Sequence, residues 1–197
     1  VTGPVCGFGG RAIRAGDEPK YLNSPETPLY HKSSVLYGFY EAKPEIRKQH
    51  SAIIDEGYMD VIALHQAGFS TAVASSGTAL TLDQVRQLKK IVDMLYFAFD
   101  QDEAGKAAAQ RALTETRAED VSVKVVRWDG AKDPDELTKN DPTLFIKALE
   151  NSTPGNSFLL SYYSAQNGTK TPLEKKAVLE NLLPALRQTP NALERDA

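Results

Sequence analysis

The run MLYFAFDQDEAG, residues 94–105, decides the fold of this 197-residue chain. Its first six residues are apolar or aromatic, as in a buried strand, and Asp100 and Asp102 come next. From Glu103 to Thr116 an alanine-rich stretch has the composition of a helix. A buried strand that passes through an acidic turn into a helix is typical of the βαβ unit of a parallel sheet.

The same alternation of strand and helix extends on both sides of this run. Strands are predicted at residues 52–55, 71–74, 94–99 and 121–126. Helices are predicted between them, at residues 58–67, from Thr81 or Asp83 to about Ile91, and at residues 103–116. We therefore expect the α/β class, with a mainly parallel four-stranded sheet and flanking helices.

The chain outside residues 49–132 has a different character. Residues 1–48 are rich in glycine, proline, tyrosine and basic residues, so loops and short extended pieces are expected there. After Trp128, further helices are predicted at residues 142–150, 156–166 and 172–186. We predict three parts: an N-terminal basic segment (1–48), the sheet domain (49–132) and a C-terminal helical subdomain (133–197).

The composition is that of a globular chain, with 41% hydrophobic and 25% charged residues. The net charge of −3 argues against a protein that only coats DNA electrostatically. Residues 1–50 carry a net charge of +2, whereas residues 51–150 carry −6. Acidic side chains are therefore concentrated where the predicted strands end.

The single cysteine, Cys6, excludes an internal disulfide framework and a thiolate zinc site. A reducing cytoplasm fits this composition. No apolar run is long enough to cross a bilayer, so no membrane association is expected. The chain begins at Val1 and ends in mid-pattern, so we expect it to be a piece of a longer protein.

Two acidic clusters follow two of the predicted strands. Asp55 and Glu56 end the first, with Asp60 in the next helix, and Asp100 and Asp102 end the third. Because the carboxyl ends of parallel strands share one edge of the sheet, these side chains should converge there. Neighbouring carboxylates repel one another, and Mg²⁺ or Mn²⁺ is the cation that suits oxygen ligands. The sequence therefore predicts a metal site for phosphate chemistry, with Glu56, Asp100 and Asp102 at its centre.

Each carboxylate also has a simpler interpretation. Asp102 could only cap the following helix, and Glu56 could be a solvated acid or a general base with a raised pKa. Asp60 could join the site or only favour the dipole of its helix. Asp133 and Asp135 flank a proline after the fourth strand and could cap a helix or supply a further metal position. The residues alone leave these alternatives open.

The N-terminal segment supplies charges that complement the acidic clusters. Basic side chains interleaved with aromatic ones are typical of nucleotide or single-stranded nucleic-acid binding, through phosphate pairing and base stacking. The candidates are Arg11, Arg14, Lys20, Tyr21, Tyr30, His31 and Lys32.

Together these motifs resemble the RNA polymerase core of bacterial-type DNA primases. Residues 56–60, Glu-Gly-Tyr-Met-Asp, and residues 99–105, Phe-Asp-Gln-Asp-Glu-Ala-Gly, match the two signature motifs of the toprim fold that primases share with topoisomerases. Residues 20–32 are similar to the basic element of primases, and residues 8–11 and 132–135 also fit. Two residues depart from the family pattern: Gln101 stands where glycine is usual, and Asp55 where an apolar or small residue is usual.

The resemblance implies template-directed, metal-dependent synthesis of short RNA primers from ribonucleoside triphosphates during replication, which is a nucleotidyltransferase activity. It implies that Glu56, Asp100 and Asp102 hold two or more Mg²⁺ or Mn²⁺ ions. It also implies that nucleotide or template is bound by Arg11, Lys20, Tyr21, Asn23 and Lys32.

The partners implied by the resemblance are a single-stranded DNA template, ribonucleoside triphosphates, an RNA–DNA hybrid and a replicative helicase. The helicase would bind through a C-terminal domain that these residues lack, and the zinc-binding domain of the family is lacking too, so no zinc is expected here. We expect a monomeric fragment that works at the bacterial nucleoid and primes poorly alone. The alternatives are a toprim-type metal-dependent nuclease, which the basic element argues against, and a nucleotide- and metal-binding module that is inactive in isolation.

Overall fold

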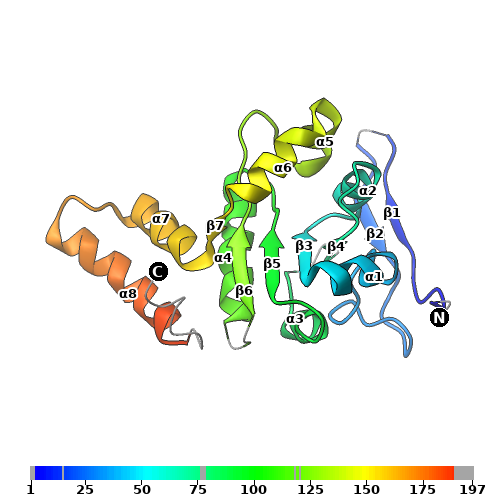
Figure 1. Ribbon diagram of the computed structural model, residues 1–197, viewed down its shortest axis with the longest axis horizontal. Coiled ribbons are helices and arrows are strands. Elements are labelled where there is room, and N and C mark those ends of the chain that lie inside the picture. Colours follow the sequence, from blue (N-terminus) through cyan, green and yellow to red (C-terminus); the bar gives the residue numbers. More distant parts are fainter. Residues whose placement is uncertain (1–2, 15, 76–78, 118, 120, 189–197) are drawn as a thin grey trace.

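A mixed sheet forms the centre of the molecule in the computed structural model, which describes residues 3–14, 16–75, 79–117, 119 and 121–188 (Figure 1). Its strands are β3 (Ser51–Asp55), β4 (Ala72–Ala74), β5 (Met94–Phe97), β6 (Ser122–Val125) and β7 (Thr153–Pro154). Their order in the sheet is β4-β3-β5-β6-β7. The first four strands pair in parallel, as predicted, and β7 pairs antiparallel with β6.

The prediction of four strands is one strand short. β7 has only two residues, one of them a proline, so it carries neither the alternation nor the apolar run that marks a strand in sequence. Proline is tolerated there because β7 lies at the edge of the sheet.

Helices cover both faces of the sheet. They are α1 (Phe39–Gln49), α2 (Tyr58–Gln66), α3 (Leu82–Lys89), α4 (Glu103–Thr116), α5 (Pro134–Asn140), α6 (Pro142–Glu150), α7 (Gly155–Asn167) and α8 (Pro172–Gln188). Residues of α1, α3, α4, α7 and α8 share one apolar core with Ile54 and Phe97, whereas residues of α2, α5 and α6 share another with Ile53. Because neighbouring residues of a strand point to opposite faces, Ile53 and Ile54 belong to different cores.

Helix α1 lies within the N-terminal segment, whose weak periodicity led to no prediction of a helix. Ala42 and Ile46, four residues apart, are fully buried, which gives the helix one apolar face. Pro44 lies between them and obscures the helical pattern in the sequence.

The first part of the chain forms a small antiparallel hairpin of β1 (Gly9–Arg11) and β2 (Tyr21–Asn23). Figure 1 places this hairpin beside α2, and the pair of α7 and α8 at the opposite end of the molecule. Within the described residues, none of the helices is both long and apolar enough to cross a membrane.

Candidate metal and nucleotide site

The predicted carboxylates gather at the edge of the sheet where the parallel strands end. Glu56 follows β3 directly, and Asp60 lies in the first turn of α2. Asp100 lies between β5 and α4, and Asp102 is the N-cap residue of α4. Asp133 is the N-cap residue of α5, which follows β6. Three strand-to-helix connections thus bring acidic side chains to one edge.

Glu56 has an environment that disfavours its charged form. Burial first, and then the charge of Asp100, raise its pKa from 4.5 to about 7, while Arg111 of α4 opposes the shift. Its Oε1 atom is buried and has no hydrogen-bond partner in the part of the chain that the structure describes. An orphaned carboxylate oxygen beside other acids is a natural ligand for a cation.

The charge of Asp100 interacts with two neighbouring aspartates and two lysines. Partial burial raises its pKa, and Asp133 and Asp102 raise it as well. Lys132 and Lys20 act in the opposite direction. The effect of Lys20 shows that the N-terminal basic segment reaches the acidic edge.

Asp60 belongs to the same group. Burial raises its pKa to about 6, followed by the charges of Asp133 and Asp100. Its Oδ1 accepts a hydrogen bond from the Asp135 N–H at 3.4 Å. The side chain of Asp60 thus contacts the first turn of α5, next to the N-cap residue Asp133.

Two of the aspartates, Asp102 and Asp133, also have the simpler capping role considered above, whereas Asp135 lies within α5 and does not cap it. Asp102 Oδ1 accepts a hydrogen bond from the Gly105 N–H at 2.8 Å, and Asp133 Oδ1 accepts one from the Glu136 N–H at 2.8 Å. Asp135 forms an ion pair with Lys139 at 2.7 Å. Each cap engages one oxygen of its carboxylate, so capping leaves the second oxygen for another ligand.

No group of three or more His, Cys, Asp or Glu side chains among the described residues is arranged to hold a metal ion directly. The chemistry of the donors nevertheless fits Mg²⁺ or Mn²⁺, because all of them are carboxylate oxygens. Burial is the first cause of the raised pKa values of Glu56, Asp60 and Asp100, and repulsion from neighbouring carboxylates, which a divalent cation would relieve, adds to it. The carboxylates that would hold it are Glu56, Asp100 and Asp102, with Asp60, Asp133 and Asp135 beside them.

Two glycines pack closely against residues of this acidic edge. A Cβ atom on Gly105 would lie 2.0 Å from the Asp100 carbonyl oxygen, and one on Gly57 would lie 2.6 Å from Asp60 Oδ2. The Gly105 contact is with backbone, so the second motif needs glycine at this position, whereas the Asp60 side chain can move away from a Cβ at residue 57.

A cavity of about 330 Å³ lies between the hairpin and α5. Arg11 and Tyr21 of the hairpin line one side, and Asp60, Lys132 and Asp133 are among the residues that line the other. Basic and aromatic groups thus face acidic ones across a space, as a nucleotide with bound cations would require.

The hairpin is fixed to the acidic edge through aromatic contacts. The Tyr21 ring packs edge-on against Tyr58, the first residue of α2, with 5.6 Å between ring centroids. The Tyr58 hydroxyl donates a hydrogen bond to the Gly10 carbonyl oxygen. Arg11 and Lys20 lie over the Tyr21 ring, at 5.8 Å and 5.5 Å from its centroid. The predicted residues Arg11, Lys20 and Tyr21 therefore form one unit.

Lys20, Asn23 and Lys32 are not among the residues that line this cavity, and neither are the three central carboxylates Glu56, Asp100 and Asp102. Lys32 lies in a segment held by Gln84, a fully buried residue of α3. Gln84 Nε2 donates to the Val35 carbonyl oxygen at 2.8 Å and to that of Lys32 at 3.4 Å, and its Oε1 accepts from the Thr81 N–H at 3.0 Å. The backbone of Lys32 is thereby fixed to the sheet domain.

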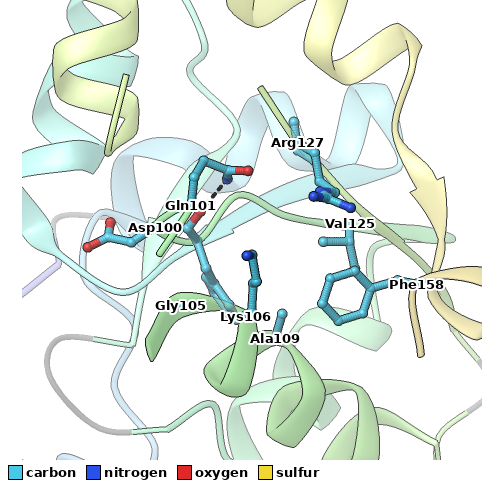
Figure 2. Close-up of a pocket in the computed structure, with 10 residues that line it drawn as sticks. Asp100, Gln101, Gly105, Lys106, Ala109, Val125, Arg127 and Phe158 are labelled. Atoms are coloured by element: carbon cyan, nitrogen blue, oxygen red, sulfur yellow. Dashed lines mark hydrogen bonds between the residues drawn. The ribbon is translucent and has the colours of Figure 1, made fainter. Parts of the chain in front are cut away.

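Figure 2 shows a smaller recess on the other side of Asp100. Lys106 of α4 and Arg127, which follows β6, extend into it above Ala109 and Phe158. Two cations beside a candidate metal ligand could hold an anionic group. Neither Lys106 nor Arg127 was identified from the sequence. The signal for Arg127 was its spacing, because it follows Val125 by two residues and alternate residues of an extended segment point to the same face.

Gln101, one of the two departures from the family pattern, connects the loops at this edge. Its N–H donates to the Lys132 carbonyl oxygen at 3.0 Å, and its Nε2 donates to the Phe99 carbonyl oxygen at 2.8 Å. Gln101 therefore links the loop that carries Asp100 to the loop that carries Asp133.

Comparison with known proteins agrees with this geometry. Residues 1–43 match the family model for the N-terminal domain of the DNA primase catalytic core, and residues 53–138 match the Toprim-like family model. The chain is 37% identical to the DNA primase of Escherichia coli K12 over 193 residues, which cover 95% of this chain and 33% of that protein. The chain belongs to the bacterial-type DNA primase family.

Other members of the family extend the comparison. The DNA primase of Synechococcus elongatus is 47% identical over 160 residues, which cover 78% of this chain and 23% of that protein. The solved catalytic core of E. coli primase superposes with a TM-score of 0.85 at 35% identity and covers 96% of this chain. A DnaG primase catalytic domain bound to ssDNA superposes with a TM-score of 0.84 at 34% identity. The toprim-type α/β fold is confirmed.

The primase chain described here is shorter than its relatives. It spans about a third of the curated primases that it matches and 62% of the E. coli and ssDNA-bound core structures.

The raised pKa of Glu56 predicts how stability depends on pH. A free carboxyl group titrates near pH 4.3, so the folded state of Glu56 binds its proton more tightly than the unfolded state does. The resulting stabilisation is full below about pH 4.3 and is lost as the pH rises through about 7. Without metal, we expect Glu56→Gln to gain stability relative to the unaltered chain between pH 5 and 8.

Urea unfolding at a series of pH values measures this difference. Glu103→Gln is the matched control, since Glu103 is an exposed residue at the start of α4. A stability difference for Glu56→Gln that stays constant across the pH range would contradict the assignment of the raised pKa.

Proposed function

We propose that this chain is the metal- and nucleotide-binding part of a primase that synthesises short RNA primers from ribonucleoside triphosphates on single-stranded DNA. One observation carries the proposal: carboxylates from three strand-to-helix connections meet at one edge, and Arg11 of the β1–β2 hairpin faces Asp60 and Asp133 across a cavity. Family membership supports the activity, and the primase catalytic domain bound to ssDNA supports the template.

Two or more Mg²⁺ or Mn²⁺ ions at this edge would supply charge neutralisation for the triphosphate and activate the attacking 3′-hydroxyl. Glu56, Asp100 and Asp102 are the proposed ligands, with Asp60, Asp133 and Asp135 as further ones. Their repulsion without metal gives the edge its affinity for cations. The α4 N-terminus, with its free N–H groups, also favours phosphate at this edge.

The hairpin would bind and orient the substrate. Arg11 and Lys20 would pair with phosphate oxygens, and Tyr21 would stack against a base or ribose, since its ring is 43% exposed beside both cations. Asn23 and Lys32 lie farther along the same segment and would contact the template. Water is displaced from the cavity when these groups close on the substrate, which strengthens their ionic contacts.

The proposal extends to organisation and partners. The two family-model matches, at residues 1–43 and 53–138, support a division into a basic segment (1–48), a toprim domain (49–132) and a helical subdomain (133–197). We also propose two partners, a replicative helicase and an RNA–DNA hybrid. We further propose a monomeric state, work at the nucleoid and the absence of zinc from this part of the protein. They follow from membership of the family.

A primer-synthesis assay tests the proposal. The full-length parent is incubated with single-stranded DNA, labelled ribonucleoside triphosphates and either Mg²⁺ or Mn²⁺. Short labelled RNA that requires both metal and template is the expected product. Shortened DNA in place of RNA would favour the toprim nuclease, and metal binding with neither product would favour an inactive binding module.

The role of the hairpin has its own test, the variant Lys20→Ala. A charge-assisted hydrogen bond contributes about 1.5–3 kcal/mol, so we expect the KM for nucleotide to rise about 10- to 100-fold. The kcat should change much less, because Lys20 contacts bound substrate before and during the reaction alike. Steady-state kinetics of primer synthesis measures both values.

Arg14→Ala is the matched control, because Arg14 is an exposed cation of the same segment and, unlike Lys20, is not among the cations that lie over the Tyr21 ring. Equal effects of the two variants would indicate a general contribution of charge and would contradict a specific contact of Lys20.

A further inference from the structure

Asp55 is a buried carboxylate below the candidate metal site. It is the last residue of β3, and only 1% of its surface is exposed. It pairs in register with Ala74 of β4, which belongs to the apolar core shared by α2, α5 and α6. Because the partners in a parallel register point to the same face, the Asp55 side chain lies under α2, on the side of Asp60.

Only half of this carboxylate has a partner. Asp55 Oδ1 accepts a hydrogen bond from the Gly57 N–H at 3.1 Å. Asp55 Oδ2 is buried and accepts none from any residue that the structure describes. Asp60 Oδ2 lies against the same glycine, 2.6 Å from the position that a Cβ of Gly57 would occupy. Asp55, Gly57 and Asp60 therefore form one contact group, with Glu56 between the first two.

An unpartnered buried carboxylate oxygen costs free energy, because it loses water without gaining another donor. Packing does not require it, since an apolar side chain would fill the same position under α2 without this cost. Repulsion from Asp60 adds to the cost, because both groups are acidic. A bound cation with its water would account for the arrangement. The water supplies a hydrogen-bond donor to Asp55 Oδ2, and the positive charge offsets the repulsion between Asp55 and Asp60.

We propose that Asp55 is a positioning residue of the metal site. Its Oδ1 fixes the turn that presents Glu56, and its Oδ2 accepts a hydrogen bond from the hydration shell of a divalent cation held by the neighbouring carboxylates. Mg²⁺ and Mn²⁺ commonly keep part of their water, and acceptors behind the ligands orient them and raise affinity. The inference rests on the proposed function, because it requires the cation.

Two variants separate the two oxygens. Asp55→Val removes both acceptors and fills the space with an apolar group. Asp55→Asn keeps an acceptor for the Gly57 N–H but puts an NH₂ group, which cannot accept, in place of Oδ2. Mn²⁺ affinity is measured by titration calorimetry on the 197-residue chain, and thermal unfolding is measured without metal.

We expect Asp55→Val to weaken Mn²⁺ binding about 10- to 100-fold, which is the usual effect of removing a group that supports a metal ligand. Its Tm without metal should equal or exceed that of the unaltered chain, because an unpartnered buried oxygen has been removed. Asp55→Asn should also weaken binding, but less, because the Gly57 turn is kept. A residue that only shapes the turn would give the opposite pattern, with a lower Tm for Val and normal binding for Asn.

Asp93→Asn is the matched control, since it removes one negative charge at the opposite end of β5, where the Asp93 side chain is 87% exposed. Its Mn²⁺ affinity should be unchanged. Unchanged affinity in Asp55→Val, while Asp100→Ala loses binding, would overturn the role of Asp55 and leave the metal site standing. No Mn²⁺ binding by the unaltered chain would overturn the proposed metal site together with this inference.

Discussion

Replacing Asp100 by alanine in the full-length parent is expected to reduce primer synthesis about 10³-fold, because ligands of a catalytic metal contribute several kcal/mol of charge stabilisation and each 1.36 kcal/mol is a factor of ten. Asp100 interacts with acids of two connections, since burial and then the charges of Asp133 and Asp102 raise its pKa. Single-turnover primer synthesis at saturating Mg²⁺ measures the loss.

The fold should survive this change. The raised pKa of Asp100 marks an unfavourable environment for its charge, so Asp100→Ala should keep or raise the Tm of the metal-free protein. Asp93→Ala is the control, because it removes an exposed carboxylate at the far end of the same strand. As many primers from Asp100→Ala as from Asp93→Ala would contradict the assignment of Asp100 as a metal ligand.

Gly105→Ala is the second variant with a large expected effect. The added Cβ would lie 2.0 Å from the Asp100 carbonyl oxygen, 2.7 Å from its carbonyl carbon and 2.9 Å from its Cα. Backbone cannot yield as a flexible side chain does, so α4 and the Asp100 loop must separate. We expect a destabilisation near the upper end of the range of about 1–3 kcal/mol for overpacking, together with a large loss of activity.

Urea unfolding and primer synthesis measure these two effects. Ala104→Ser is the control, because Ala104 is exposed in the same turn of α4. Normal stability combined with normal activity in Gly105→Ala would show that the Asp100 loop can shift without affecting the carboxylate, and would contradict the close packing described here.

Much of the fold could be predicted because apolar runs and helical spacing reflect burial directly. The strands at residues 52–55 and 94–99 are long enough to be recognised, and each has neighbours that bury both of its faces. Helix α1 was missed because Pro44 interrupts the pattern, although Ala42 and Ile46 are buried. Strand β7 was missed because two residues carry no period, and only its pairing with β6 defines it.

The location of the site could be predicted, because strand ends in a parallel sheet share an edge. What the sequence could not supply was the side of the sheet on which each carboxylate lies. Asp55 and Glu56 are neighbours in the chain, yet Asp55 packs under α2 whereas Glu56 is influenced by Arg111 of α4. The recess of Lys106 and Arg127 also could not be predicted, because it depends on contacts between α4, β6 and α7, which are far apart in the sequence. The catalytic roles remain predictions.

The buried amide of Gln84 has a consequence for the cost of substrate binding. With its three hydrogen bonds to Thr81, Lys32 and Val35, it anchors the basic segment to a helix of the sheet domain before any nucleotide arrives. Part of the ordering entropy that a free loop would lose on binding is therefore lost during folding instead. The segment that carries Lys32 is preorganised, so loss of the Gln84 contacts would weaken the proposed binding of substrate by Lys32 without removing any group that touches substrate.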